Sequence, residues 1–163
     1  MKLIRKVSLA KWKGCLENDV DYISADAVTA CLRTTGNSLS VWKADSLEEI
    51  NCALLALAAS LQRLDAIEYV TLNGDDLKTG NLDIENTLVD IPVNTPKGLH
   101  HDIINLDHSA LKVVANLIKK EVSENKHTRL SRTQAKNILI EAIKKDLIKK
   151  ERLPLKLVEG IEK

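Results

Sequence analysis

The sequence predicts an α/β fold: a small, mostly parallel sheet of three to four strands flanked by helices, with a two-helix C-terminal third. Three observations predict it. Strand and helix patterns alternate over the first 72 residues, in the order that β-α-β units require. A long irregular stretch over 73–98 then interrupts the pattern. Two helical patterns with their own start signals fill most of residues 99–163.

The predicted core begins with a strand. Residues 2–9 partly alternate apolar and polar side chains and include β-branched residues. Residues 13–23 contain a glycine, an asparagine and several acids, so we expect a loop there. A short helix over 24–32 follows, with Ser24 as its N-cap, because a serine hydroxyl accepts a hydrogen bond from the first helical turn. Residues 38–43 alternate again and predict a second strand.

The clearest local signal is a capping box, in which Ser46 and Glu49 each satisfy a backbone amide of the other. It predicts a helix over 47–63 that is apolar on more than one face, and is therefore deeply buried or supports a partner surface. Residues 67–72 predict a third strand. With the strand over 38–43 they form a β-α-β unit, whose strands we expect to be parallel and joined by a right-handed crossover.

The stretch over 73–98 is expected to be a long loop that is functional or mobile, since such segments are uncommon inside compact domains. Within it, only residues 88–93 predict a short edge strand. A helix over 107–124 follows, and either Asp107 or Ser109 caps it. This helix and the first short helix would together cover the two faces that a parallel sheet buries.

A second capping box, formed by Ser131 and Gln134, predicts the last long helix, whose apolar stripe continues to Leu147. The residues after Pro154 are expected to form a short tail or a docking strand. We interpret the 163 residues as a single domain. Residues 1–98 would form its α/β core, including the long loop over 73–98, and residues 99–163 its helical part.

Composition predicts a cytoplasmic protein with an aliphatic core. Three cysteines, none in a C-x-x-C pair, are too few for a disulfide framework. The N-terminal segment lacks the apolar stretch of a signal peptide, and the longest apolar run, 52–59, is far shorter than the roughly 20 residues that span a bilayer. The chain has no phenylalanine and 2% aromatic residues, which argues against stacking bases or sugars on rings.

Catalytic motifs are absent from the sequence. It contains no phosphate-binding G-x-x-x-x-G-K-[ST] or G-x-G-x-x-G, and no G-x-S-x-G nucleophile elbow. We therefore assign no catalytic residue and expect no cofactor. A metal-dependent hydrolase or nuclease is the first alternative, because imidazoles and carboxylates are common metal ligands. Its candidate ligands are clustered in the sequence: His100, His101, Asp102 and His108.

Charge is distributed unevenly along the chain. Residues 97–163 hold 15 Lys/Arg and 9 Asp/Glu, a net charge of +6, whereas residues 1–96 hold 9 and 14, a net charge of −5. The basic end suggests a second alternative, a nucleic-acid-binding regulator with a helix-turn-helix. Its candidate residues lie around the break between the last two long helices: Lys126, Arg129, Arg132 and Lys136.

The sequence favours a non-catalytic protein–protein interaction protein of bacterial type. An immunity protein, an antitoxin or an accessory subunit that occludes or positions its partner would fit, because unlike charges steer association. The acidic half would face a basic partner. Its candidate contact residues are Asp45, Glu48, Glu49, Asp75 and Asp76, with Glu17, Asp19, Asp21 and Asp26 on the same half of the chain.

Overall fold

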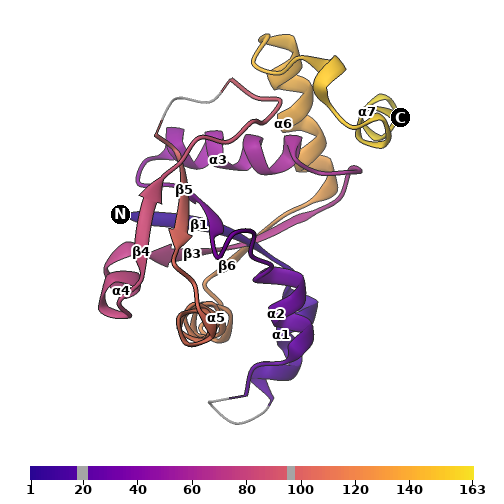
Figure 1. The fold of residues 1–163 in the computed structure, drawn as a ribbon. Helices are drawn as coiled ribbons and strands as arrows, with labels where there is room; N and C mark the ends of the chain where they lie inside the picture. The colour runs from indigo at the N-terminus through magenta and orange to yellow at the C-terminus, as the bar shows by residue number, and fades with distance from the viewer. Residues whose placement is uncertain (18–21, 95–97) are drawn as a thin grey trace.

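A computed structural model describes residues 1–17, 22–94 and 98–163. Its centre is a six-stranded sheet with the order β4-β5-β2-β1-β3-β6 (Figure 1). The strands are β1 (Lys2–Val7), β2 (Leu39–Lys43), β3 (Ile67–Asn73), β4 (Asp83–Asn86), β5 (His100–Ile104) and β6 (His127–Leu130). All neighbouring strands are antiparallel, so the prediction of a small, mostly parallel sheet of three to four strands is wrong.

The position of β1 explains this difference. β1 pairs antiparallel with both β2 and β3, so those two strands point the same way but are not neighbours. Leu3, Ile4 and Val7 are buried on both faces of β1, as expected for a central strand. The β2–α3–β3 crossover therefore passes over β1. Sequence periodicity identifies β1, β2 and β3 but not β4, β5 or β6, and it does not show that β1 inserts between β2 and β3.

Two layers of helices cover the sheet (Figure 1). The helices are α1 (Leu9–Leu16), α2 (Ala25–Cys31), α3 (Leu47–Ala59), α4 (Gly74–Thr79), α5 (His108–Ser123), α6 (Arg132–Lys144), the 3₁₀ helix η1 (Lys150–Arg152) and α7 (Leu155–Glu162). α1, α2 and α5 pack on one face, and α3, α6 and α7 lie on the other. We expected α2 and α5 to cover opposite faces, which is wrong.

The capping signals read from the sequence are confirmed. The Glu49 amide donates to the Ser46 hydroxyl at 3.2 Å, and the Ser46 amide donates to the Glu49 carboxylate at 3.3 Å. The equivalent box at Ser131 and Gln134 starts α6. α3 is apolar on several faces because it lies between the sheet and α6, and it contributes to two of the three hydrophobic clusters.

The stretch over 73–98 is not one long loop. α4 starts directly after β3, where the Asn73 side chain accepts a hydrogen bond from the Asp75 amide at 3.1 Å. β4 follows and pairs with β5 as an edge strand. The predicted edge strand over 88–93 is therefore misplaced. Of those residues, Val93 forms an isolated antiparallel bridge with Ile148.

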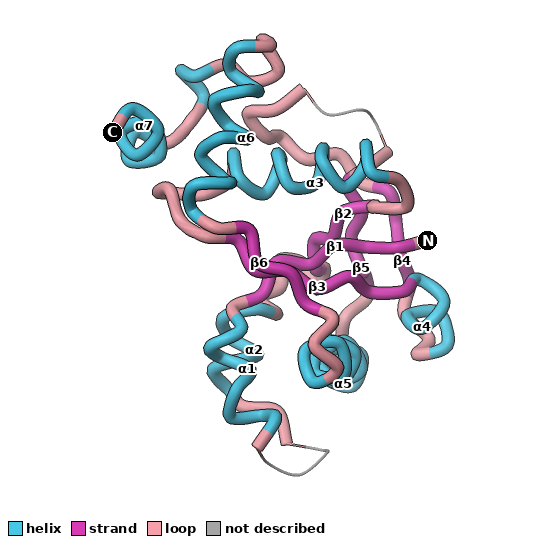
Figure 2. Tube along the Cα trace, turned by 180° about the vertical axis from the view of Figure 1, so that it is seen from behind, coloured by secondary structure: helices cyan, strands magenta, loops and turns pink. Residues whose placement is uncertain are grey.

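The C-terminal third is not two helices, because it also contributes β5 and β6 to the sheet and ends in α7. β6 is the outer strand beside β3, and it carries the chain from α5 on one face to α6 on the other (Figure 2). α7 replaces the expected tail, and Leu157 and Ile161 bury its apolar side. Among the described helices, none is long and apolar enough to cross a membrane.

Near the N-terminus, α1 extends into the predicted loop over 13–23, of which residues 18–21 lie outside the described residues. The Ser8 side chain does not cap α1. Instead the Glu68 carboxylate of β3 accepts a hydrogen bond from the Leu9 amide at 2.8 Å. The cap that stabilises the start of α1 is thus supplied from a distant part of the chain, where no local pattern reveals it.

Candidate functional site

The sheet separates the histidines that are adjacent in the sequence. Because successive side chains of a strand point to opposite faces, His100 and Asp102 share one face of β5, whereas His101 shares the other with Ile103. His108 begins α5, which packs on the His101 side of the sheet. Within the described ranges, no three His, Cys, Asp or Glu side chains are placed to hold a metal ion together. The four-residue metal cluster therefore does not assemble.

His100 and Asp102 are instead joined through Thr87, at the end of β4. The Thr87 hydroxyl lies 2.8 Å from His100 Nδ1 and 2.9 Å from Asp102 Oδ2. A carboxylate only accepts hydrogen bonds, so the hydroxyl donates to Asp102 and accepts from His100 Nδ1–H. This chain of hydrogen bonds selects the Nδ1-protonated tautomer of His100.

The His100 ring is enclosed. It is 8% exposed, and it makes an edge contact with Trp42 at 4.9 Å between ring centroids. Burial lowers the pKa of His100 below its usual 6.5, although the Asp102 charge and a hydrogen bond with the Thr87 backbone act in the opposite direction. His100 is therefore neutral at pH 7. Its hydrogen bonds hold Thr87 in place, where the chain leaves β4.

Thr87 is the first of several anchors of the segment 87–94, which we call the 87–94 loop. The Thr87 amide donates to the His100 carbonyl at 3.1 Å. Farther along, Asp90 forms an ion pair with Arg152 at 2.5 Å. At the far end Val93 bridges Ile148, and the Asn94 amide donates to the Leu147 carbonyl at 3.1 Å. The loop is thus held at both ends and near its middle.

The anchors leave two apolar side chains of the loop in water. Leu88 is 89% exposed, the largest value among the large hydrophobic residues that the structure describes, and Val89 is 40% exposed. Ile91 packs against the hydrophobic clusters and Val93 is buried, so the loop also has an inward side. A loop that buries two apolar residues while presenting two others is an ordered surface rather than an unpacked segment.

The surface next to the loop is basic and partly apolar. We call residues 145–156, which the Asp90–Arg152 and Val93–Ile148 contacts place beside the loop, the C-terminal corner. Leu147 and Leu155 are exposed there. Three lysines of the corner have no acidic partner within the described part of the chain: Lys145, Lys149 and Lys156. The corner therefore carries positive charges that no acidic side chain of the described residues neutralises.

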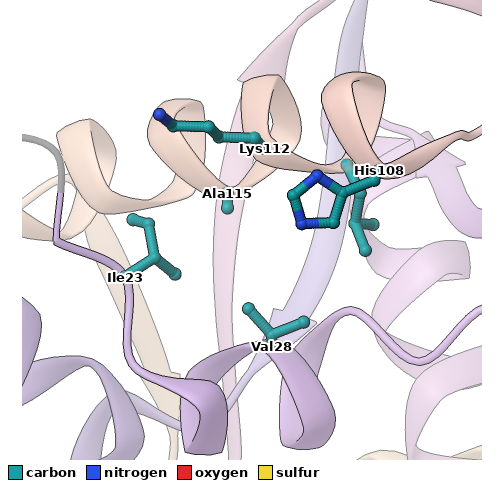
Figure 3. A pocket seen from close by; sticks show the side chains of 6 residues that line it. Ile23, Val28, His108, Lys112 and Ala115 are labelled. Atoms are coloured by element: carbon teal, nitrogen blue, oxygen red, sulfur yellow. The ribbon is translucent and has the colours of Figure 1, made fainter.

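A separate cleft lies between α2 and α5, on the opposite face of the sheet (Figure 3). Its volume is about 320 Å³. The lining residues are Ile23, Val28, His108, Leu111, Lys112 and Ala115. His108 thus lies at a mainly apolar cleft and not beside His100. The sequence offers no signal for this cleft, because its two walls come from segments about 80 residues apart.

The acidic candidates occupy several environments. Asp45 accepts from the Lys2 amide at 2.7 Å, which joins the segment before α3 to β1, and Glu49 forms an ion pair with Lys43 at 2.8 Å. These contacts lower the pKa of each carboxyl. The structure brings the candidates together only in pairs: Asp76 lines a hollow with Asp45, Lys120 and Lys126, and Glu48 lines a different hollow with Glu49. Asp75 is exposed on α4. Of the other acids, Asp19 and Asp21 lie outside the described residues.

The basic candidates do not form a helix-turn-helix, since β6 separates α5 and α6 and these helices cover opposite faces. Lys126 pairs with Glu124, and Arg129 lies 3.8 Å from Glu68. Arg132 and Lys136 are on α6.

The residues that sequence reasoning missed are Thr87, Leu88 and Arg152. An adjacent Leu88–Val89 pair in a turn-rich stretch was the available signal.

Comparison of the chain with protein-family models, with curated proteins and with solved structures finds no match in any of the three.

Proposed function

We propose that the protein is a non-catalytic interaction module of bacterial type, and that the 87–94 loop is its docking element. The observation that carries this proposal is Leu88, 89% exposed on a loop anchored at both ends. Burial of apolar surface stabilises a protein or a complex by about 25 cal/mol per Å². Exposed apolar side chains that lie together can therefore gain this free energy when a partner covers them, and such patches often mark interaction sites.

Anchoring of the loop supports this reading. A flexible loop loses conformational freedom when it binds, whereas a loop already fixed by neighbouring contacts loses little. The Thr87 hydrogen bonds and the Asp90–Arg152 ion pair hold the loop in one conformation before the partner arrives. The hydrogen bonds that join His100, Thr87 and Asp102 order a surface loop, which is consistent with a binding role. This role requires no catalytic residue.

The proposed occupant is a protein with an apolar recess bordered by acidic side chains. Leu88 and Val89 would enter the recess, and the unpaired lysines of the C-terminal corner would meet the acids. An immunity protein, an antitoxin or an accessory subunit would act in this way. Action in the cytoplasm fits the three cysteines, which are all free thiols.

The test measures one partner against matched leucine variants. Affinity capture from the native host first supplies a candidate partner, which is then purified. Leu88→Gln is expected to weaken its binding by at least about tenfold, as removal of a central apolar anchor does. Leu47→Gln is the control, because Leu47 is 73% exposed on α3 and lies outside the loop.

Equal affinity of the wild-type protein and Leu88→Gln would contradict the proposal. A second result against it is Leu88-dependent binding to phosphatidylglycerol vesicles, because apolar and basic side chains together also suit an anionic lipid surface.

A further inference from the structure

The α2–α5 cleft has the composition of a small-ligand site. Its walls are aliphatic: Ile23 and Val28 point toward α5, and the buried Ala115 faces them from α5 (Figure 3). Leu111 of α5 also lines the cleft. The cleft has a volume of about 320 Å³, which suits a small ligand. Ligand pockets begin at about this volume and are mainly apolar with few polar groups.

The polar groups of the cleft are nitrogen donors. His108 and Lys112 are four residues apart on α5, so they project from the same side of the helix. The Lys112 side chain extends along α5 toward the Ile23 end of the cleft (Figure 3). Within the described ranges no acid pairs with Lys112, and Asp26 of α2 is engaged by Lys11 at 3.0 Å.

We propose that this cleft binds a small apolar monocarboxylate, with its hydrocarbon chain between α2 and α5 and its carboxylate at Lys112. Burial of the chain supplies most of the affinity. The unpaired ammonium selects an anion over a neutral or cationic ligand of the same shape.

The inference does not depend on the proposed function. The cleft lies on the α2–α5 face, whereas the 87–94 loop packs against clusters formed with α3 and α6 on the other face. A protein seated on the loop would not cover the cleft. Loss of one activity would therefore leave the other measurable.

The test uses octanoate, which has ten non-hydrogen atoms, and octanol, which keeps the chain but lacks the charge. Amide chemical shifts of the full-length protein are followed by NMR during titration with each compound. Octanoate is expected to bind with a dissociation constant on the order of 1 mM or lower and to shift residues 23, 28, 111 and 115. Octanol is expected to bind more weakly.

Two variants of exposed lysines on α5 test the role of charge. Lys112→Gln is expected to raise the dissociation constant of octanoate about three- to fivefold, the usual effect of a partly exposed ion pair, and to leave octanol unchanged. Lys120→Gln removes an equal charge outside the cleft and should leave both constants unchanged.

Three results would overturn the inference. The first is no shift at the cleft residues up to about 10 mM octanoate, well above the expected constant. The second is equal binding of octanoate and octanol that Lys112→Gln does not alter. The third is a response of the cleft residues to a protein partner alone, which would make the cleft part of a protein interface.

Discussion

At the residue scale, Thr87 holds together the polar chain at the root of the 87–94 loop. Its single hydroxyl satisfies both His100 Nδ1 and the Asp102 carboxylate, in a setting where His100 is almost fully enclosed. The three residues come from the end of β4 and from β5, which are paired only in the folded sheet. A search of the sequence for histidines and acids finds two of them and misses the third.

Replacing the hydroxyl tests this arrangement. Thr87→Val keeps the shape of the side chain but leaves the imidazole N–H and the carboxylate without their shared partner. We expect the free energy of unfolding to fall by about 1–2 kcal/mol, the cost of leaving such groups unpaired. Thr87→Ser keeps the hydroxyl and is expected to lose less. Urea denaturation measures both, and a valine variant as stable as the wild type would disprove the arrangement.

The lowered pKa of His100 predicts how stability depends on pH. Above its unfolded-state pKa of 6.5, His100 is neutral in both states and adds no pH dependence. Below pH 6.5 the unfolded state takes up a proton while the folded state resists it, so stability falls until the pH reaches the folded-state pKa. Asp102 and Thr87 raise this folded-state pKa and His101 lowers it. These three residues therefore help to set the pH below which stability stops falling.

The measurement is urea denaturation of the wild type and His100→Gln between pH 8 and pH 5. The glutamine variant does not titrate at this position, so its stability should fall less steeply below pH 6.5. Identical slopes for the two proteins would show that His100 is not the group responsible. Comparing slopes rather than absolute stabilities removes the constant effect of the lost hydrogen bond.

At the scale of elements, signals that act within one segment are reliable and signals that depend on distant partners are not. The N-caps at Ser24, Ser46, Asp107 and Ser131 are all confirmed, because each involves residues within one helical turn. By contrast, the start of α1 receives its cap from Glu68. No periodicity in residues 9–16 contains that information.

The strand β5 illustrates the same limit at the candidate site. Its sequence, HHDII, resembles a polar loop or a metal-binding cluster. Pairing with β2 and β4 makes it a strand, which sends His100 and His101 to opposite faces. Whether adjacent histidines converge or diverge is decided by the neighbouring strands. The split of the histidine cluster was therefore not predictable from spacing alone.

The Asp90–Arg152 contact joins the 87–94 loop to η1, and its loss should affect binding more than folding. Arg152→Gln is expected to change the free energy of unfolding by less than about 1 kcal/mol, because the pair is exposed. Affinity for the partner should fall severalfold, since the loop must then be ordered on binding.

Lys150→Gln is the matched control for this variant. It removes an equal charge from η1, where Lys150 pairs with Glu162 of α7 and not with the loop. Titration calorimetry gives the affinities and urea denaturation gives the stabilities. If both variants weaken binding equally, charge alone explains the effect and the ion pair does not order the loop.

At the scale of the whole molecule, the insertion of β1 between β2 and β3 determines where the surfaces lie. It turns an expected β-α-β core into an antiparallel sheet whose two faces carry different helices. The 87–94 loop lies on the α3 side and reaches the segment after α6, where Val93 bridges Ile148. The α2–α5 cleft lies on the other side. One sheet thus separates two candidate binding surfaces.

The most direct test of the docking proposal is amide hydrogen exchange, measured on the protein alone and in complex with its purified partner. The account predicts slower exchange on binding at Leu88, Val89 and Asp90, and at the adjoining residues of the C-terminal corner. Protection confined to α4 and the start of α3, with unchanged exchange over 87–94, would contradict it and would move the interface to the acidic residues Asp45, Glu48, Asp75 and Asp76.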